Sequence, residues 1–124
     1  MSYTTYKLIH LVGVILLFFS LGGATLHALN GGDKENNRGR ALLASFHGVA
    51  LLLLLVAGFG ALVKLGIKAP PLWVWGKLGI WLLLAAAPVL IRKKPDLAKV
   101  LFFLLPALGI AAALLALAKP GAVS

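Results

Sequence analysis

Four ionisable side chains lie inside long apolar stretches of this sequence: His10, His27, His47 and Lys77. An ionisable group is costly to bury among apolar neighbours, so each of these positions indicates either a functional site or a specific hydrogen bond. A neutral imidazole can bind a metal or haem iron, transfer a proton, or donate to a backbone carbonyl, and a lysine can pair with an anion. No catalytic residue is identified by these side chains alone.

Several residue types and motifs that particular functions require are missing from this sequence. None of the three acidic residues lies inside an apolar stretch, which disfavours a pump that relies on membrane carboxylates. The chain has no cysteine, so thiolate ligands, disulfides and covalent haem attachment are excluded. HExxH, GxSxG and Walker motifs are also absent. A zinc site needs three or four converging ligands, whereas one or two neutral imidazoles suffice as axial ligands of haem b.

Composition indicates a membrane protein. The chain has 124 residues, of which 61% are hydrophobic, and a mean hydropathy of +1.02. A soluble domain of this size leaves too much of its surface in water to accommodate such a composition. The net charge of +9 comes mostly from Lys and Arg at the ends of the apolar stretches and in the loops, where cations meet lipid headgroups. We therefore expect the lipid bilayer as the main partner, and no nucleic acid.

The apolar stretches and their breaks predict an all-α, integral membrane, up-down-up-down antiparallel four-helix bundle, with residues 1–124 as one transmembrane domain. The expected spans are about 6–29, 41–63, 72–91 and 97–118. Glycines at 31 and 32 and prolines at 70 and 71 mark breaks between helices. Asp96 is the expected N-cap of the last span. The segment Thr25–Ala28 is a poor cleavage site for a signal peptide, so we expect the first span to be retained.

Small and polar residues of the first span lie on one side of a helix. At heptad spacing they form two adjacent rows, Tyr6, Gly13, Ser20 and His27 in one and His10, Leu17 and Ala24 in the other. In the second span, His47 shares a face with Ala44, Leu51, Leu54, Gly58 and Ala61. Small residues allow helices to approach closely, so we expect both faces to point into the bundle.

The order of the spans places the ionisable groups at two ends of the bundle. His10 and Lys77 each lie near the start of a span and share one end, whereas His27 and His47 belong to the other. His47 should lie about 7–8 Å deeper than His27, at 1.5 Å per residue. We therefore expect one polar site in each leaflet rather than a single cluster.

Each histidine also has an interpretation that needs no ligand. His10 and His27 are close enough to the ends of their span to lie at headgroup level. His47 could bond to a neighbouring carbonyl and contribute to helix packing alone. Both interpretations stay open at the level of the sequence.

Lys77 could extend its four-carbon chain to the membrane interface. Trp73 and Trp81 lie four residues on either side of it, on the same helix face. With Trp75, these side chains are typical of an interfacial aromatic belt.

The sequence resembles small four-span bacterial membrane proteins of the HemJ, CopD and SirB type. The similar segments are KLIHLVGV in the first span, GVALLLLLVAGFGAL in the second and LWVWGKLGI in the third. The HemJ-type proteins are protoporphyrinogen oxidases that bind haem b and use a first-span histidine and a third-span lysine. The resemblance implies corresponding roles for His10 and Lys77, and a haem-dependent membrane oxidoreductase if the protein is an enzyme.

Three hypotheses follow. The first is a protein of the bacterial inner membrane that binds haem b for electron transfer or porphyrin oxidation. Its candidate iron ligands are His10, His47 and His27, and Lys77 would lie near a propionate. Such a protein would also require a quinone or another redox partner. The second is a structural or assembly protein whose histidines only join helices. The third is a small transporter or channel, which would need a multimer with a continuous polar seam.

The distribution of basic residues predicts the orientation. Seven Lys and Arg flank the first and third connections, against five at the other end, so both termini should lie outside the cytoplasm. Glycines and alanines on outer helix faces would also suit a homo-oligomer.

Overall fold

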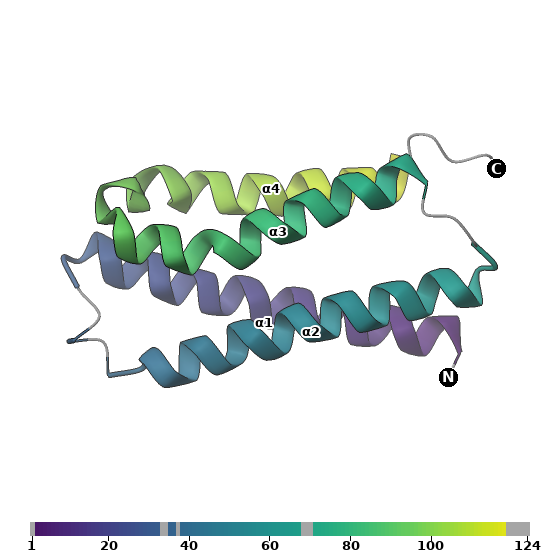
Figure 1. Cartoon of the computed structure of the whole chain (residues 1–124), viewed down its shortest axis with the longest axis horizontal. Helices are drawn as coiled ribbons and strands as arrows, with labels where there is room; N and C mark the ends of the chain where they lie inside the picture. Colours follow the sequence, from purple (N-terminus) through teal and green to yellow (C-terminus); the bar gives the residue numbers. More distant parts are fainter. Residues whose placement is uncertain (1, 33–34, 37, 68–70, 119–124) are drawn as a thin grey trace.

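In a computed structural model, the described residues form four long helices and one short 3₁₀ turn (Figure 1). The structure describes residues 2–32, 35–36, 38–67 and 71–118. The elements are α1 (Tyr3–Leu29), α2 (Arg40–Lys64), α3 (Leu72–Lys93), η1 (Pro95–Leu97) and α4 (Ala98–Ala118). No strand occurs in the described ranges, and the prediction of an all-α chain is confirmed.

Helices α1 and α2 end in the same type of glycine cap. Gly31 and Gly66 have φ values of +78° and +76°, a conformation that favours glycine. At α1, Gly31 N–H donates to the Ala28 carbonyl and Gly32 N–H to the His27 carbonyl, the pattern of a Schellman motif. The expected stop after the first span is therefore confirmed at Gly31.

The other helix ends differ slightly from the expected spans. Helix α1 begins at Tyr3 because the Ser2 hydroxyl accepts a hydrogen bond from Thr5 N–H at 3.2 Å and caps the first turn. Helix α3 starts directly after Pro71, which occupies the N-cap; Pro70 lies outside the described residues. Asp96 lies within η1, whereas the sequence pattern suggested an N-cap for the last helix.

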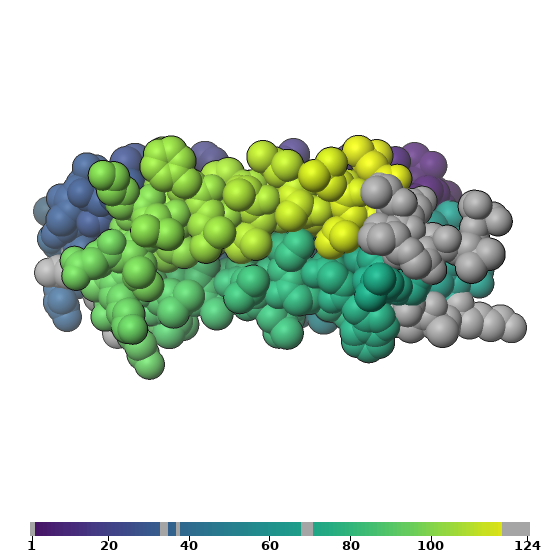
Figure 2. All heavy atoms as spheres, turned by 90° about the horizontal axis from the view of Figure 1, so that it is seen from above, coloured from purple at the N-terminus to yellow at the C-terminus, as the bar shows by residue number. Residues whose placement is uncertain are grey.

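The helices form two hairpins that lie against each other, with consecutive helices running in opposite directions (Figure 1). Helix α1 is central, because it contacts α2 along most of its length and also packs against α4 and α3. Helices α3 and α4 lie side by side on one face of the elongated molecule (Figure 2). Helices α2 and α3 meet at only a few positions.

Helices α1 and α2 approach each other closely at Gly13. A Cβ atom built at this position would lie 3.2 Å from the Ala50 carbonyl oxygen and 3.2 Å from side-chain atoms of Leu53 and Leu54. Gly13 is buried together with Leu17 and Ser20, as the heptad rows predict. A small residue therefore permits the α1–α2 contact.

The rows predicted from the sequence are incomplete. Leu21 and Thr25 are also buried, although neither belongs to a row. The face assigned to the second span is partly wrong, because Ala44 is exposed while Ala50 and Ala57 are buried. Helix α1 packs against three helices at once, so its buried arc is wider than a two-helix seam.

The main core lies between the two hairpins. It joins Leu17 and Leu21 of α1 to Leu84 and Ala87 of α3 and to other buried apolar side chains of α2 and α4. A second cluster forms at the end where the segment 65–71 connects α2 to α3, and it contains Leu62, Trp73 and Val74. These clusters determine the positions of the polar side chains described below.

Outward surfaces are strongly apolar. Large side chains such as Ile15, Phe103 and Val63 are 68%, 69% and 73% exposed. Exposing so much apolar surface to water is unfavourable, whereas contact between this surface and lipid chains is not. All four helices are long and apolar enough to cross a bilayer, which indicates a multi-pass membrane protein.

The Gly13 contact yields a test. Replacing Gly13 with leucine should force α1 and α2 apart, because the new Cβ meets a backbone oxygen that cannot move away. We expect a loss of about 1–3 kcal/mol in the free energy of unfolding, as for other overpacked positions, measured by denaturation in detergent micelles. Gly48→Leu is the control, because Gly48 is exposed and has no atom within 4 Å of a built Cβ. Equal stability of the two variants would contradict the α1–α2 packing.

Candidate functional site

His10 lies on the side of α1 that faces α2. Its Nδ1 atom is 3.2 Å from the Leu54 carbonyl oxygen. The ring is half-buried, and it stacks against Gly58, whose built Cβ would lie 3.5 Å from Nδ1 and Cε1. Because a carbonyl oxygen only accepts, His10 donates through Nδ1–H, and its Nε2 remains an acceptor in the neutral ring.

Tyr6 extends this arrangement by one helical turn. The Tyr6 ring occupies the space in which a side chain of Gly60 would otherwise lie. Two glycines of α2, Gly58 and Gly60, thus make room for two aromatic rings of α1. The close packing of these rings fixes the side of α1 from which His10 reaches α2.

Lys77 joins this region from α3. Its side chain is half-buried, and its ammonium group lies near enough to His10 for the two groups to interact electrostatically. The structure therefore places His10 and Lys77 at the same end of the bundle, as the order of the spans predicts.

His47 and Trp81 connect α2 to α3. His47 Nε2 lies 3.1 Å from the Leu84 carbonyl oxygen, so it donates to α3. Trp81 Nε1–H donates to the Leu51 carbonyl at 3.2 Å in the opposite direction, from α3 to α2. These two bonds lie along a seam where the helices otherwise touch little, so long polar side chains hold α2 and α3 together.

His27 occupies a different place, at the last turn of α1. Its ring packs over Gly32, where a Cβ would overlap the imidazole. His27 thus belongs to the helix cap rather than to the bundle interior. It lies seventeen residues after His10 in the sequence, about 25 Å along the helix axis.

The three histidines do not converge. Within the described residues, no group of three or more His, Cys, Asp or Glu side chains could hold a metal ion. The carbonyl of Leu54, which His10 contacts, is seven residues from His47, or about 10 Å along α2. Two axial imidazoles must reach the same iron atom, so this arrangement does not suit a haem held by both His10 and His47.

A single axial ligand suits the donor chemistry better. Histidines that bind metals commonly donate their other ring nitrogen to a carbonyl, which fixes the ring and its tautomer. His10 has this pattern, with Nδ1 bonded to Leu54 and Nε2 left as the acceptor. His47 has the reverse pattern, because its Nε2 is bonded to Leu84. Of these two histidines, His10 is therefore the better candidate for a haem ligand.

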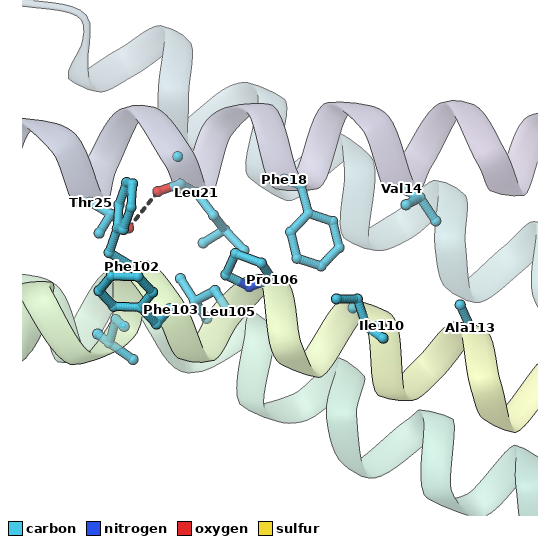
Figure 3. A pocket seen from close by; sticks show the side chains of 13 residues that line it. Val14, Phe18, Leu21, Thr25, Phe102, Phe103, Leu105, Pro106, Ile110 and Ala113 are labelled. Atoms are coloured by element: carbon cyan, nitrogen blue, oxygen red, sulfur yellow. Dashed lines mark hydrogen bonds between the residues drawn. The ribbon is translucent and has the colours of Figure 1, made fainter.

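A large concave surface lies elsewhere. A groove of about 640 Å³ runs between α1 and α4, and Figure 3 shows Phe18, Phe102, Phe103 and Pro106 around it. Its lining is almost entirely apolar, and the hydroxyl of Thr25 is already bonded to the Leu21 carbonyl at 2.7 Å. None of the three histidines lines this groove, nor does Lys77.

Sequence reasoning missed the role of Trp81. It treated Trp73 and Trp81 with Trp75 as an interfacial belt, but Trp73 is buried, Trp81 is half-buried and only Trp75 is exposed. A signal was present, since Trp81 lies nine residues into α3, about 13 Å from its start. An indole at that depth needs a partner for its N–H group, and the sequence does not say which carbonyl will face it.

Comparison of the chain with protein-family models, with curated proteins and with solved structures gives no match. The resemblance to HemJ-type proteins therefore stays a hypothesis, and functional conclusions depend on the geometry described above.

The Trp81 hydrogen bond can be tested alone. Trp81→Phe keeps an aromatic ring but removes the donor to Leu51, so we expect a loss of about 0.5–1.7 kcal/mol of stability, the range found for hydrogen bonds between membrane helices. Trp75→Phe serves as the control, because Trp75 is exposed. Denaturation in micelles measures both variants. If Trp81→Phe is no less stable than the control, the bond does not hold α2 to α3.

Proposed function

We propose that this chain is an integral membrane protein with an up-down-up-down antiparallel bundle, and that its task is structural or assembly-related rather than catalytic. The observation that carries this proposal is the pair of hydrogen bonds from His10 and His47 to carbonyl groups of neighbouring helices. In this function both histidines serve to join helices. Trp81 contributes a third bond of the same kind.

The surroundings of His10 and His47 favour a structural role for both side chains. A hydrogen bond between apolar helices satisfies a donor that has no water to bond with. The helices contain no Asp or Glu, so a histidine in their interior has no carboxylate with which to relay protons. The described part of the chain also offers no cluster of metal ligands. Helix joining thus accounts for His10 and His47 without a further component.

A second candidate function is haem b binding through His10 alone. It is favoured by the Nδ1–H bond to Leu54, which leaves Nε2 available to iron, and by the nearby ammonium of Lys77, which could pair with a propionate. Bound haem would supply one-electron chemistry for electron transfer or porphyrin oxidation in the bacterial inner membrane. A quinone or another redox partner would then exchange the electrons.

Absorbance spectra of the protein, purified from haem-supplemented cells, distinguish the two functions. The structural function predicts no Soret band in oxidised or dithionite-reduced samples, even after hemin is added. It also predicts that His47→Leu lowers stability by about 0.5–1.7 kcal/mol, through loss of the bond to Leu84. A Soret band that persists in His47→Leu and disappears in His10→Ala would instead establish the haem protein and overturn the first proposal.

The orientation predicted from the basic residues, with both termini outside the cytoplasm, has a direct test. Since the chain contains no cysteine, a single one can be introduced at Ser2 or at Asn36, which lie at opposite ends of the molecule. With both termini outside the cytoplasm, a membrane-impermeant maleimide should label Ser2→Cys in spheroplasts. Asn36→Cys should be labelled only after the membrane is disrupted. The reverse pattern would show that the seven-to-five charge bias does not set the topology.

A further inference from the structure

Lys77 differs from the other polar side chains of the bundle interior. His10, His47 and Trp81 each bond to a backbone carbonyl, whereas Lys77 has no hydrogen bond or ion pair within the described part of the chain. Its side chain is half-buried and lies close enough to His10 for an electrostatic interaction. Helix joining therefore does not account for Lys77.

Neither of the two acidic side chains that the structure describes is placed to neutralise Lys77. The three acids are Asp33, Glu35 and Asp96. The last lies in η1, after the end of α3, and Glu35 lies in the connection between α1 and α2 at the same end of the molecule (Figure 1). Asp33 is outside the described residues, but it follows Gly32 directly in the sequence. Lys77 precedes the last residue of α3 by sixteen positions, about 24 Å along the axis.

A partly buried charge without a counter-charge raises the free energy of the folded protein. An anion from outside the chain would compensate Lys77, since no acidic side chain of the described residues lies at this end. Lys77 is five residues into α3, about 8 Å from its start, and the exposed Trp75 lies two residues before it. Exposed tryptophans are enriched at the membrane interface, where the phosphates of anionic lipids are the abundant negative groups.

We propose that Lys77 and His10 form a binding site for the headgroup of an anionic phospholipid. The ammonium of Lys77 pairs with the phosphate oxygens, and Nε2 of His10 accepts a hydrogen bond from a headgroup hydroxyl. Nδ1 of His10 cannot fulfil this role because it already donates to Leu54 at 3.2 Å. A lipid with a phosphate and a hydroxylated headgroup, such as phosphatidylglycerol, meets both requirements. The site goes beyond helix joining and does not require haem.

Native mass spectrometry of the full-length protein in a neutral detergent tests the proposal. The protein is titrated with phosphatidylglycerol and with phosphatidylcholine of the same acyl chains. We expect the anionic lipid to bind at least about 5-fold more tightly, the effect of one lysine near the membrane surface. Lys77→Gln should abolish this preference, and Lys77→Arg should retain it. Lys64→Gln is the matched control, because Lys64 is exposed near the same end of the bundle.

The contribution of His10 is separable from that of Lys77. Phosphatidylmethanol carries the phosphate without headgroup hydroxyls, so the protein should bind it more weakly than phosphatidylglycerol. His10→Phe should remove this difference while the preference for anionic over zwitterionic lipid remains. If His10→Phe leaves the difference unchanged, the headgroup hydroxyl does not bind His10.

Further measurements identify the source of the phosphate and the specificity of the site. If millimolar inorganic phosphate displaces phosphatidylglycerol, the ligand that pairs with Lys77 is a free phosphate ion. If it does not, the ligand is the phosphate of the lipid headgroup. Equal binding of the two lipids to the unmodified protein would overturn the proposal. So would an equal loss of preference in Lys64→Gln and Lys77→Gln. These readouts do not depend on haem, so they can fail while either proposed function holds.

Discussion

The organisation of this protein depends on one constraint: a hydrogen-bonding group buried among apolar helices, where water is absent, must find a partner. Backbone carbonyls of the helices supply that partner. His10, His47 and Trp81 bond to carbonyls of neighbouring helices, at 3.1–3.2 Å. Ser20 and Thr25 bond to carbonyls of their own helix, at 2.8 Å and 2.7 Å. No buried side-chain nitrogen or oxygen in the described ranges lacks a hydrogen-bond partner.

The two kinds of hydrogen bond have different consequences. A hydroxyl that bonds within its own helix is satisfied wherever that helix packs, so it places no demand on the neighbours. A bond from His47 to α3, or from Trp81 to α2, exists only in one relative position of the two helices. The glycine contacts of α1 with α2 and the polar contacts of α2 with α3 are therefore complementary: small residues bring one pair together, and long side chains connect the other.

The proposed function and the proposed lipid site both involve His10, and the lipid site also involves Lys77. His10 satisfies one nitrogen through Leu54 and retains another as an acceptor, and Lys77 brings a positive charge to the same place. The first property is sufficient for a structural role, and the second is not explained by one. The large apolar groove between α1 and α4 contains neither residue. The hydrogen bonds between helices thus lie at the α1–α2 and α2–α3 contacts, while the lining of the groove is almost entirely apolar.

The all-α class, the four apolar helices and the glycine stop at the end of α1 could be predicted from the sequence, because they depend on local composition and on residues adjacent in the chain. The shared location of His10 and Lys77 also followed from span order, since antiparallel helices determine which ends meet. Asp96 and Ala44 were placed incorrectly because a cap and a buried face depend on how neighbouring elements pack.

The sequence by itself determined where polar groups occur and at what depth along each helix. Only the tertiary structure decided which carbonyl each group reaches: Leu54 for His10, Leu84 for His47 and Leu51 for Trp81. The reason is physical. Every residue of an apolar helix carries a carbonyl group, so composition cannot distinguish one acceptor from another. The rotation and offset of neighbouring helices, fixed by packing at positions such as Gly13, select the acceptor.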